Sequence, residues 1–150
     1  GLIKNRYIGS TFIRPTQQQR MQGMRVRLNA ISSVVKDKSV YLVDDSVVKG
    51  FTSRRICQLL KEAGAKEVHL RIASPMLKYP CLYGADSTAQ KDLAAFNYSV
   101  DEMKQLFQVD SLRFISVEDF KKCVPETSCL ACCTGEYPEE LQDYKDEVKE

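Results

Sequence analysis

The chain has 150 residues, of which 43% are hydrophobic and 28% are charged. This is the composition of one ordinary globular domain, and it argues against intrinsic disorder, a collagen-like fibre and a coiled coil. The formal net charge of +2 conceals an asymmetry, because residues 1–75 carry 14 Lys and Arg against 5 Asp and Glu, whereas residues 76–150 carry 8 against 15. An anionic ligand is therefore expected in the basic half.

No apolar run approaches the roughly 20 residues that a membrane-spanning helix needs, and no signal-peptide pattern opens the chain. We therefore expect a soluble, cytoplasmic protein without a membrane partner. The basic stretch before Asp37 offers only Tyr7 and Phe12 as stacking surfaces, and its charges are not densely clustered. Nucleic-acid binding is therefore not expected. Because the first residue is not Met, we expect that the chain is a piece of something longer.

The first part of the chain gives weak signals for regular structure. Residues 1–29 are expected to form a loop or a short hairpin, with a helical turn near Gln17–Gln22, because Pro15 and the glutamines interrupt any regular period. Val40–Val43 is then a compact apolar run rich in β-branched residues. This pattern predicts a buried parallel strand in the middle of a sheet.

A helix and a second strand follow this first strand. Thr52 or Ser53 is expected to cap a helix whose apolar residues recur at helical spacing, and Gly64 is expected to end it. Val68–Ile72 has the pattern of the next strand. The succession therefore predicts a β–α–β unit with a right-handed crossover.

The remaining signals extend the same architecture. Ser99 and Glu102 predict a capping box at the start of a helix that ends near Gln108. Leu112–Ile115 predicts a third short strand, and Ser116 opens another helix with acidic residues in its first turn. The predicted fold class is α/β, with a parallel sheet flanked by helices, and residues 123–150 are expected to form a peripheral extension that contains cysteines.

The segment from Val40 to Ser53 carries the strongest functional signal. A strand ends in Asp44 and Asp45, whose carboxylates can accept hydrogen bonds from sugar hydroxyls or hold Mg²⁺. The loop from Gly50 to Ser53 then enters a helix, whose free N–H groups can cradle an anion. It is neither a Walker A loop nor a glycine-rich dinucleotide fingerprint. The alternative is that the two acids are only a polar strand exit and that Ser53 is only a helix cap.

This segment resembles the phosphoribosyl pyrophosphate (PRPP) motif of type I phosphoribosyltransferases. The stretches Lys4–Pro15, Lys78–Gly84 and Cys129–Pro138 resemble, in addition, parts of the glutamine PRPP amidotransferases, so the resemblance spans essentially the whole chain. It implies an enzyme that forms 5-phosphoribosylamine from PRPP and glutamine-derived ammonia in the first step of purine biosynthesis. It also implies a type I phosphoribosyltransferase fold that is incomplete at its N-terminal side.

The resemblance assigns domains and partners as well. Residues 1–122 correspond to the C-terminal part of the transferase domain, with residues 1–29 as its flexible catalytic loop and approach, and residues 123–150 form the C-terminal extension. An N-terminal glutaminase domain and the early transferase strands, which the resemblance also implies, are not expected within these 150 residues. Purine nucleotides are implied as further ligands, and a homo-oligomer is expected. The segment alone is expected to be inactive.

The resemblance also implies roles for individual residues. Asp44 and Asp45 would bind the ribose hydroxyls and Mg²⁺, and Lys4 would act in catalysis by binding pyrophosphate when the loop closes. The 5′-phosphate would contact a set of loop residues, namely Ser46, Lys49, Gly50, Phe51, Thr52 and Ser53.

Three positions depart from the family pattern, because Ser10 and Lys49 stand where Arg is expected and Phe51 stands where a small Thr is expected. These changes bear on turnover rather than on the fold, since a lost guanidinium removes a possible bidentate contact to an oxyanion. The alternative function is therefore a PRPP-binding sensor or regulatory module without turnover. A structural metal domain is a third interpretation.

The cysteines predict a metal site rather than a disulfide framework. Four of the six lie between residues 123 and 133, in a chain large enough to have its own core. The pair Cys129 and Cys132 has a spacing that serves both zinc and iron–sulfur clusters, and Cys81 lies in a turn between Pro80 and Gly84. Spacing alone leaves a cluster, zinc and bare thiols open.

The family resemblance implies a [4Fe–4S] cluster held by Cys81, Cys129 and Cys132, together with one upstream cysteine that this chain does not contain. Cys133 is badly placed to substitute, because it is adjacent to Cys132. Cys57 is expected to be a buried helix residue, and His69 a satisfied strand residue without a catalytic role.

Overall fold

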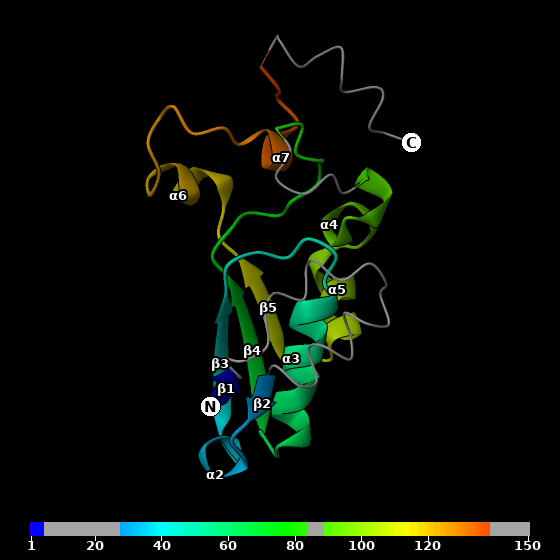
Figure 1. Ribbon diagram of the computed structural model, residues 1–150, viewed down its shortest axis with the longest axis vertical. Coiled ribbons are helices and arrows are strands. Elements are labelled where there is room, and N and C mark those ends of the chain that lie inside the picture. Colours follow the sequence, from blue (N-terminus) through cyan, green and yellow to red (C-terminus); the bar gives the residue numbers. More distant parts are fainter. Residues whose placement is uncertain (5–27, 84–88, 139–150) are drawn as a thin grey trace.

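The computed structural model describes residues 1–4, 28–83 and 89–138. Its centre is a parallel sheet of strand order β3-β4-β5, formed by β3 (Ser39–Asp44), β4 (Glu67–Ile72) and β5 (Ser111–Phe114). Two helices, α3 (Phe51–Glu62) and α5 (Val100–Phe107), pack on one face of this sheet (Figure 1). The expected α/β class with a parallel sheet and flanking helices is confirmed.

Shorter elements surround this centre. Two of them, β1 and β2, pair as antiparallel strands. Residues 5–27, which join them, lie outside the described residues, so the loop or short hairpin expected there stays a prediction. The helical turn expected at Gln17–Gln22 lies outside the described residues. The short elements are β1 (Leu2–Lys4), β2 (Leu28–Ala30), α2 (Ser32–Val35), η2 (Gln90–Asp92), α4 (Ala94–Asn97), α6 (Val117–Lys121) and α7 (Ala131–Thr134). No helix within the described ranges has both the length and the apolar character needed to cross a membrane.

The core lies between β4 and the two long helices. Alternate residues of β4 point into it, because side chains of a strand alternate between the two faces of a sheet. The largest fully buried side chains come from β4, α3, α5 and α2, and they are Val68, Leu70, Cys57, Leu60, Met103, Phe107 and Val35. This burial fixes which face of β4 lies against the helices, since a slip of one residue would turn the apolar set to the other face.

The expected position of β3 is wrong for the described part of the chain. The strand lies at the edge of the sheet, and β4 occupies the middle. Its side chains alternate in exposure, with Tyr41 at 65% and Val43 at 70%. The uniformly apolar run predicted two covered faces, but only the face toward α3 is covered by the described residues.

The start of α3 also differs from the expectation that Thr52 or Ser53 caps it. The helix begins at Phe51, and its N-cap is Gly50, with a left-handed φ of 79° and no side-chain cap. The end of α3 agrees with the sequence. Gly64 has φ of +94°, its N–H bonds to the carbonyl of Lys61, and the next N–H, of Ala65, bonds to the carbonyl of Leu60, which is a Schellman motif.

The two predicted serine caps are confirmed. Ser99 and Glu102 form a reciprocal capping box at the start of α5. Ser116 accepts a hydrogen bond from the N–H of Asp119 at 3.0 Å at the start of α6. Each bond satisfies an N–H group that the first helical turn leaves without an intrahelical acceptor.

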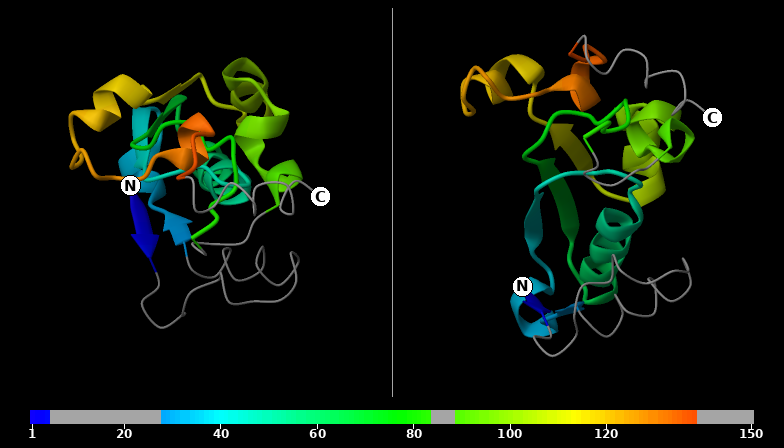
Figure 2. Two further views of the ribbon diagram at one scale, coloured as in Figure 1. Left: turned by 90° about the horizontal axis from the view of Figure 1, so that it is seen from above. Right: turned by 45° about the horizontal axis from the view of Figure 1, so that its top comes forward.

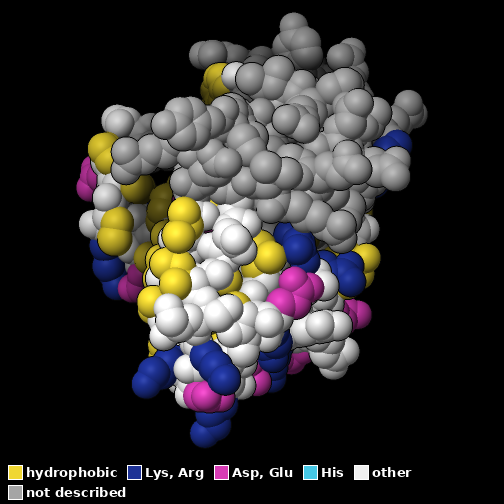
Figure 3. Space-filling model, turned by 60° about the horizontal axis from the view of Figure 1, so that its bottom comes forward, with side chains coloured by type: hydrophobic (Ala, Val, Ile, Leu, Met, Phe, Trp, Pro, Cys, Tyr) yellow, Lys and Arg dark blue, Asp and Glu magenta, His cyan; other side chains and the backbone are white. Residues whose placement is uncertain are grey.

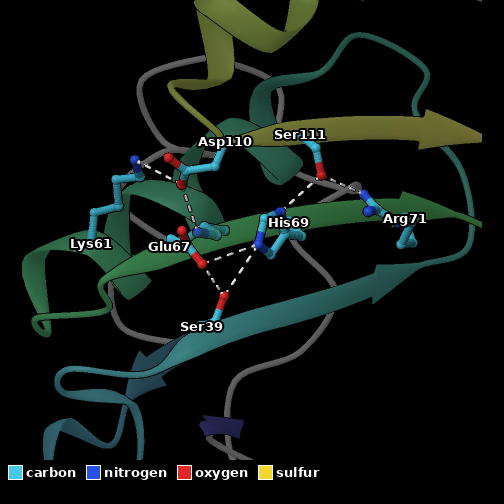
Figure 4. A network of polar contacts seen from close by, with 8 residues as sticks. Ser39, Lys61, Glu67, His69, Arg71, Asp110 and Ser111 are labelled. Atoms are coloured by element: carbon cyan, nitrogen blue, oxygen red, sulfur yellow. Dashed lines mark hydrogen bonds and ion pairs between the residues drawn. The ribbon is translucent and has the colours of Figure 1, made fainter.

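The uncovered sheet face carries a polar network centred on His69 (Figure 4). The His69 ring contacts Ser111 Oγ through Nδ1 at 2.8 Å and Ser39 Oγ through Nε2 at 3.2 Å. It also stacks on Tyr41, with ring centroids 4.7 Å apart. Arg71 donates to Ser111 Oγ and lies over the Tyr41 ring. The network spans three strands, and it agrees with a satisfied histidine.

The end of the molecule that carries α2 has a mixed surface. Seen from this side in Figure 3, hydrophobic side chains lie in a band beside Lys, Arg, Asp and Glu side chains. The strongly exposed hydrophobic residues of β1, α2 and β3 are Ile3, Val34, Tyr41 and Val43. Isolated apolar side chains are ordinary on a protein surface, but Tyr41 and Val43 share one face of a parallel strand, and both faces of parallel sheets are normally covered.

The buried thiol of Cys57 predicts an alkaline weakness of the fold. Burial is the main cause that raises its pKa to about 12, and the charge of Asp44 adds to it. Because an unfolded cysteine has a pKa of about 8.5, the stability from the neutral buried thiol is complete below that pH and is lost as the pH rises toward the folded value. The free energy of unfolding should fall by up to about 1.4 kcal/mol per pH unit in this window.

Urea unfolding at pH values of about 8 and about 10 measures the slope. Cys57→Ala should be less stable throughout but should lose this contribution to the slope. Cys123→Ala removes an exposed thiol and should keep it. Equal slopes in all three proteins would show that Cys57 does not carry the effect.

Candidate functional site

The polar loops of the chain gather at the carboxyl ends of the strands. Figures 1 and 2 show the connections that leave β3 and β4 at the same end of the sheet, where α7 also lies. A backbone hydrogen bond from the N–H of Ala73 to the carbonyl of Asp44, at 2.9 Å, joins the ends of these two strands. Ligands of open α/β sheets bind at this edge.

Asp44 and Asp45 lie directly at the end of β3. Asp44 accepts hydrogen bonds from the N–H of Asp45 at 3.1 Å and from Ser53 Oγ at 3.2 Å. Asp45 is exposed, and its Oδ1 accepts from both the N–H and the hydroxyl of Ser46, at 2.6 and 3.2 Å. The two carboxylates are therefore oriented by the loop and by α3.

In these contacts, the hydroxyls of two serines bind carboxylates, whereas the sequence predicted that they bind phosphate. Ser53 is 2% exposed, and its hydroxyl donates to a carboxylate. Ser46 likewise uses its hydroxyl on Asp45. Both serines therefore orient the acids in this structure, and a contact of either with phosphate stays a prediction.

Gly50 connects the loop to α3 and cannot easily be replaced. With φ of +79°, it has a backbone conformation that side chains disfavour, and an added Cβ would lie 2.9 Å from the Phe107 ring. The N–H of Ala94 bonds to the carbonyl of Val48 at 2.8 Å and holds the loop from the other side. The 12-residue α3 thus begins at a fixed point, and the N–H groups of its first turn have no intrahelical acceptors.

Lys49 has a partner that sequence reasoning missed. Its Nζ lies 2.9 Å from Asp92 Oδ2, and this ammonium is the main cause that lowers the pKa of Asp92. The two residues are far apart in sequence and no motif links them. Phe51 is 46% exposed, so its ring does not fill the loop.

Lys4 lies away from this loop. It is the last residue of β1, which pairs with β2 near the ends where the sheet strands begin (Figure 2). Residues 5–27, which include most of the expected catalytic loop and Ser10, lie outside the described residues. The role of Lys4 toward pyrophosphate therefore stays a prediction.

The second cluster of chemical groups joins residues 78–81 to the segment around α7. The N–H groups of Lys78 and Tyr79 both donate to the carbonyl of Cys132 at 3.0 Å. The hydroxyl of Tyr137, a residue that is 7% exposed, donates to the carbonyl of Pro80 at 2.6 Å. Cys81 is thereby brought toward Cys132 from a distant part of the sequence.

The charges of three cysteines affect the pKa of the Tyr137 phenol. Burial raises the pKa of Tyr137 to about 12, with smaller contributions from the charges of Cys132, Cys81 and Cys129. The thiols of Cys132 and Cys133 are 3.9 Å apart, and the hydrogen bond between them lowers the pKa of Cys132 to about 6 and raises that of Cys133. Within the described residues, no three His, Cys, Asp or Glu side chains stand close enough together to hold a metal ion without rearrangement.

The donor types nevertheless fit the groups expected from the sequence. Carboxylate oxygens at an exposed strand end, as in Asp44 and Asp45, are the ligands that Mg²⁺ prefers. Soft thiolates suit iron–sulfur clusters and zinc. The side chain of Cys57 is fully buried in the core and lies outside this cluster, as the sequence predicted.

Comparisons with known proteins find relatives of one kind. The chain is 48% identical to the amidophosphoribosyltransferase of Bacillus subtilis over 99% of its own length and 32% of that protein. It is also 48% identical to the amidophosphoribosyltransferase of Methanocaldococcus jannaschii, over 94% of this chain and 30% of that one. No protein-family model matches the chain.

A solved structure gives the same result. It is the glutamine PRPP amidotransferase of B. subtilis in complex with ADP and GMP, and it superimposes with a TM-score of 0.78 at 49% identity, over 95% of this chain and 33% of that one. The chain thus spans about a third of the length of the relatives it matches. The resemblance inferred from the motifs is confirmed.

Gly50→Ala is predicted to damage both the fold and the loop. The left-handed backbone costs an Ala about 1–2 kcal/mol, and the contact with Phe107 adds an overpacking cost of about 1–3 kcal/mol. Gly64→Ala is the matched control, because it has φ of +94° but meets only the flexible side chain of Lys36, at 3.2 Å. Urea unfolding should show a loss for Gly50→Ala that exceeds the loss for Gly64→Ala by at least about 1 kcal/mol. Equal losses would show that the Phe107 contact is not restrictive.

Proposed function

We propose that this chain supplies the PRPP-binding part of an amidophosphoribosyltransferase. It matches about a third of the length of such enzymes. The enzyme would form 5-phosphoribosylamine from PRPP and glutamine-derived ammonia, the first step of purine biosynthesis. The observation that carries this proposal is the loop from Asp44 to Ser53, with two oriented carboxylates at a strand end and a helix N-terminus directly after them.

The carboxylates would bind the sugar. Asp44 and Asp45 are acceptors, so they suit the two ribose hydroxyls as donors. Ser53 and Ser46 donate to these acids, and the acids therefore need little reorganisation when the ribose arrives. A bound Mg²⁺, with Asp44 and Asp45 in its environment, would supply positive charge beside the pyrophosphate.

The start of α3 would bind the 5′-phosphate. The N–H groups from Gly50 to Ser53 and the Thr52 hydroxyl are donors, and the positive end of the helix favours an anion. Lys49 would add a cation, with its Asp92 partner limiting how far the ammonium moves. Phe51 would contribute its backbone N–H, because its ring is largely in solvent.

Catalysis would rest on positioning and electrostatics. The bond from the anomeric carbon to pyrophosphate breaks as ammonia attacks, so positive charge grows on the sugar while negative charge leaves with pyrophosphate. Lys4 would stabilise the leaving group if the N-terminal loop closes over the site. Closure would also exclude water and strengthen these interactions.

The remaining two thirds of the homologous length would supply the other functions. They would include an N-terminal glutaminase domain that releases ammonia. They would also include a layer that covers the face of β3 on which Tyr41 and Val43 are exposed. The segment alone would then be inactive. By analogy with the relative solved with ADP and GMP, purine nucleotides would be ligands of the whole protein. A homo-oligomeric state and a cytoplasmic location also belong to this proposal.

A PRPP sensor without turnover is the second candidate. Lys49 supports it, because it stands where the family pattern has Arg and its ammonium is engaged by Asp92. The full-length protein decides between the two. PRPP binding together with phosphoribosylamine formation supports the enzyme, whereas binding without turnover supports the sensor.

We also propose that Cys81, Cys129 and Cys132 are three ligands of a [4Fe–4S] cluster, with a fourth cysteine from the upstream part of the polypeptide. Two sets of contacts support this proposal: the N–H groups of residues 78 and 79 bond to the carbonyl of Cys132, and the Tyr137 hydroxyl bonds to the carbonyl of Pro80, which precedes Cys81. A bound cluster would link the connection after β4 covalently to the segment around α7. Zinc and bare thiols remain the alternatives.

Asp44→Asn and Asp45→Asn should each weaken Mg·PRPP binding to the full-length protein by at least about tenfold. A charge-assisted hydrogen bond is worth about 1.5–3 kcal/mol, and tenfold corresponds to about 1.4 kcal/mol. Asp37→Asn is the control, because it makes the same chemical change outside the loop. Asp37 has a left-handed φ of 58°, which Asn tolerates. Titration calorimetry measures the affinities. If both loop variants bind PRPP like the wild type, the proposed site is wrong.

The full-length protein, purified without oxygen, should be brown and contain about four iron and four sulfide. Changing Cys81, Cys129 or Cys132 to Ser should bleach it, whereas Cys123→Ser, which alters an exposed thiol, should not. Metal and sulfide analysis with visible spectroscopy measures this. Colourless protein with stoichiometric zinc that Cys129→Ser removes would replace the cluster with zinc. Protein without either metal would leave bare thiols, and the PRPP proposal would still stand.

A further inference from the structure

The position of Cys81 depends on a junction between two distant segments of the chain. Cys81 follows β4, whereas Cys129 and Cys132 lie near α7. Nothing in the sequence between them forces the two segments together. The contacts that do so are therefore the determinants of the proposed cysteine site.

The first contact is between backbones. The carbonyl of Cys132 accepts from the N–H groups of both Lys78 and Tyr79 at 3.0 Å. This pair of bonds fixes the backbone of Cys132 to residues that precede Cys81 by only a few positions. It sets the distance between the two segments but leaves the peptide of Cys81 free to rotate.

The second contact removes that freedom. The hydroxyl of Tyr137 donates to the carbonyl of Pro80 at 2.6 Å, and both residues are buried. That carbonyl belongs to the planar peptide that joins Pro80 to Cys81. Because the Pro80 ring already restricts its own φ, holding the carbonyl fixes the peptide plane and the position of the Cys81 Cα, which limits the directions in which the Cys81 side chain can leave the backbone.

The third contact explains how Tyr137 reaches this place. Gly135 ends α7 with φ of +80°, and an added Cβ would lie 2.9 Å from the Tyr79 ring. The turn therefore needs glycine both for its backbone angle and for the close approach of Tyr79. It directs the chain back over residues 78–81, so that the phenol of Tyr137 lies within electrostatic reach of Cys81, Cys129 and Cys132.

We propose that Tyr137 is a positioning residue of the cysteine site, whose hydroxyl holds the Pro80–Cys81 peptide so that the Cys81 thiol faces Cys129 and Cys132. This inference rests on the proposed role of the three cysteines. Tyr137 itself is not a ligand in this arrangement. It acts on the site through one hydrogen bond to the peptide that carries Cys81, in the way that outer contacts orient metal ligands.

Tyr137→Phe in the full-length protein tests the proposal, because it removes only the hydroxyl. In the metal-free protein, a short bifunctional thiol reagent should link Cys81 to Cys132, and peptide mapping should show several-fold less of this product in the variant. In the loaded protein, iron should be lost to a chelator about tenfold faster, in line with the 10–100-fold effects of residues that orient metal ligands. Tyr98→Phe, the same change at an exposed tyrosine, should behave like the wild type in both measurements.

Gly135→Ala provides a second variant that disturbs the same junction without altering Tyr137. It should also reduce the Cys81–Cys132 product, while both variants keep wild-type affinity for Mg·PRPP, since neither Tyr137 nor Gly135 belongs to the proposed PRPP site. A Tyr137→Phe protein with a lower melting temperature but unchanged cross-linking and iron release would overturn the positioning role. Failure of the wild type to form the Cys81–Cys132 product would overturn the cysteine site itself, and failure to bind PRPP would instead refute the proposed function.

Discussion

The close approach of Gly50 to the Phe107 ring is the constraint on which the rest of the site depends. Phe107 is buried at the centre of the core, 2% exposed. Gly50 lies against it because a glycine is present and the backbone can turn through a left-handed angle. The acids at the end of β3 and the first turn of α3 therefore meet across a short loop. Core packing, rather than the loop residues alone, sets the distance between the ribose-binding and phosphate-binding groups that we propose.

The same end of the sheet supports two chemically different clusters. The carboxylate cluster follows β3 and the thiol cluster follows β4, and the hydrogen bond from Ala73 to Asp44 joins the two strand ends. In the proposals made above, a hard oxygen site and a soft sulfur site would lie on neighbouring strands of one sheet. Their different ligand chemistry would let each select a different metal.

Much of the fold was predictable because local signals agree with the tertiary structure. The capping box of Ser99 and Glu102, the Gly64 turn and the strand Val68–Ile72 all lie where local pattern places them. The position of β3 in the sheet was not predictable. An apolar run indicates how many faces of a strand can be buried, but it does not show which strands lie beside it. The N-cap of α3 was missed because the Gly50 conformation depends on Phe107, far away in sequence.

In the candidate site, too, some residues follow from local sequence and others only from the fold. Asp44 and Asp45 follow from a strand pattern and a motif, whereas Asp92 and Tyr137 have no local signature. Their roles arise from contacts with Lys49 and Pro80 across long stretches of chain. A single sequence reveals groups that carry chemistry at fixed spacing. It does not reveal the residues that hold those groups in place, since these act through the fold.

The charge of the described loop sets a further requirement on ligand binding. Asp44 and Asp45 place two carboxylates at the strand end, and the ammonium of Lys49 is already paired with Asp92. PRPP is itself highly anionic, so these residues by themselves repel as much as they attract. The helix end supplies only a partial positive charge. If PRPP binds as proposed, the additional cations would come from Mg²⁺ or from the basic residues before Asp37, among which six Lys and Arg precede Leu28 without an acid. In the proposed function, the excess positive charge of the N-terminal half would therefore help to bind an anion that the acidic strand end cannot bind alone.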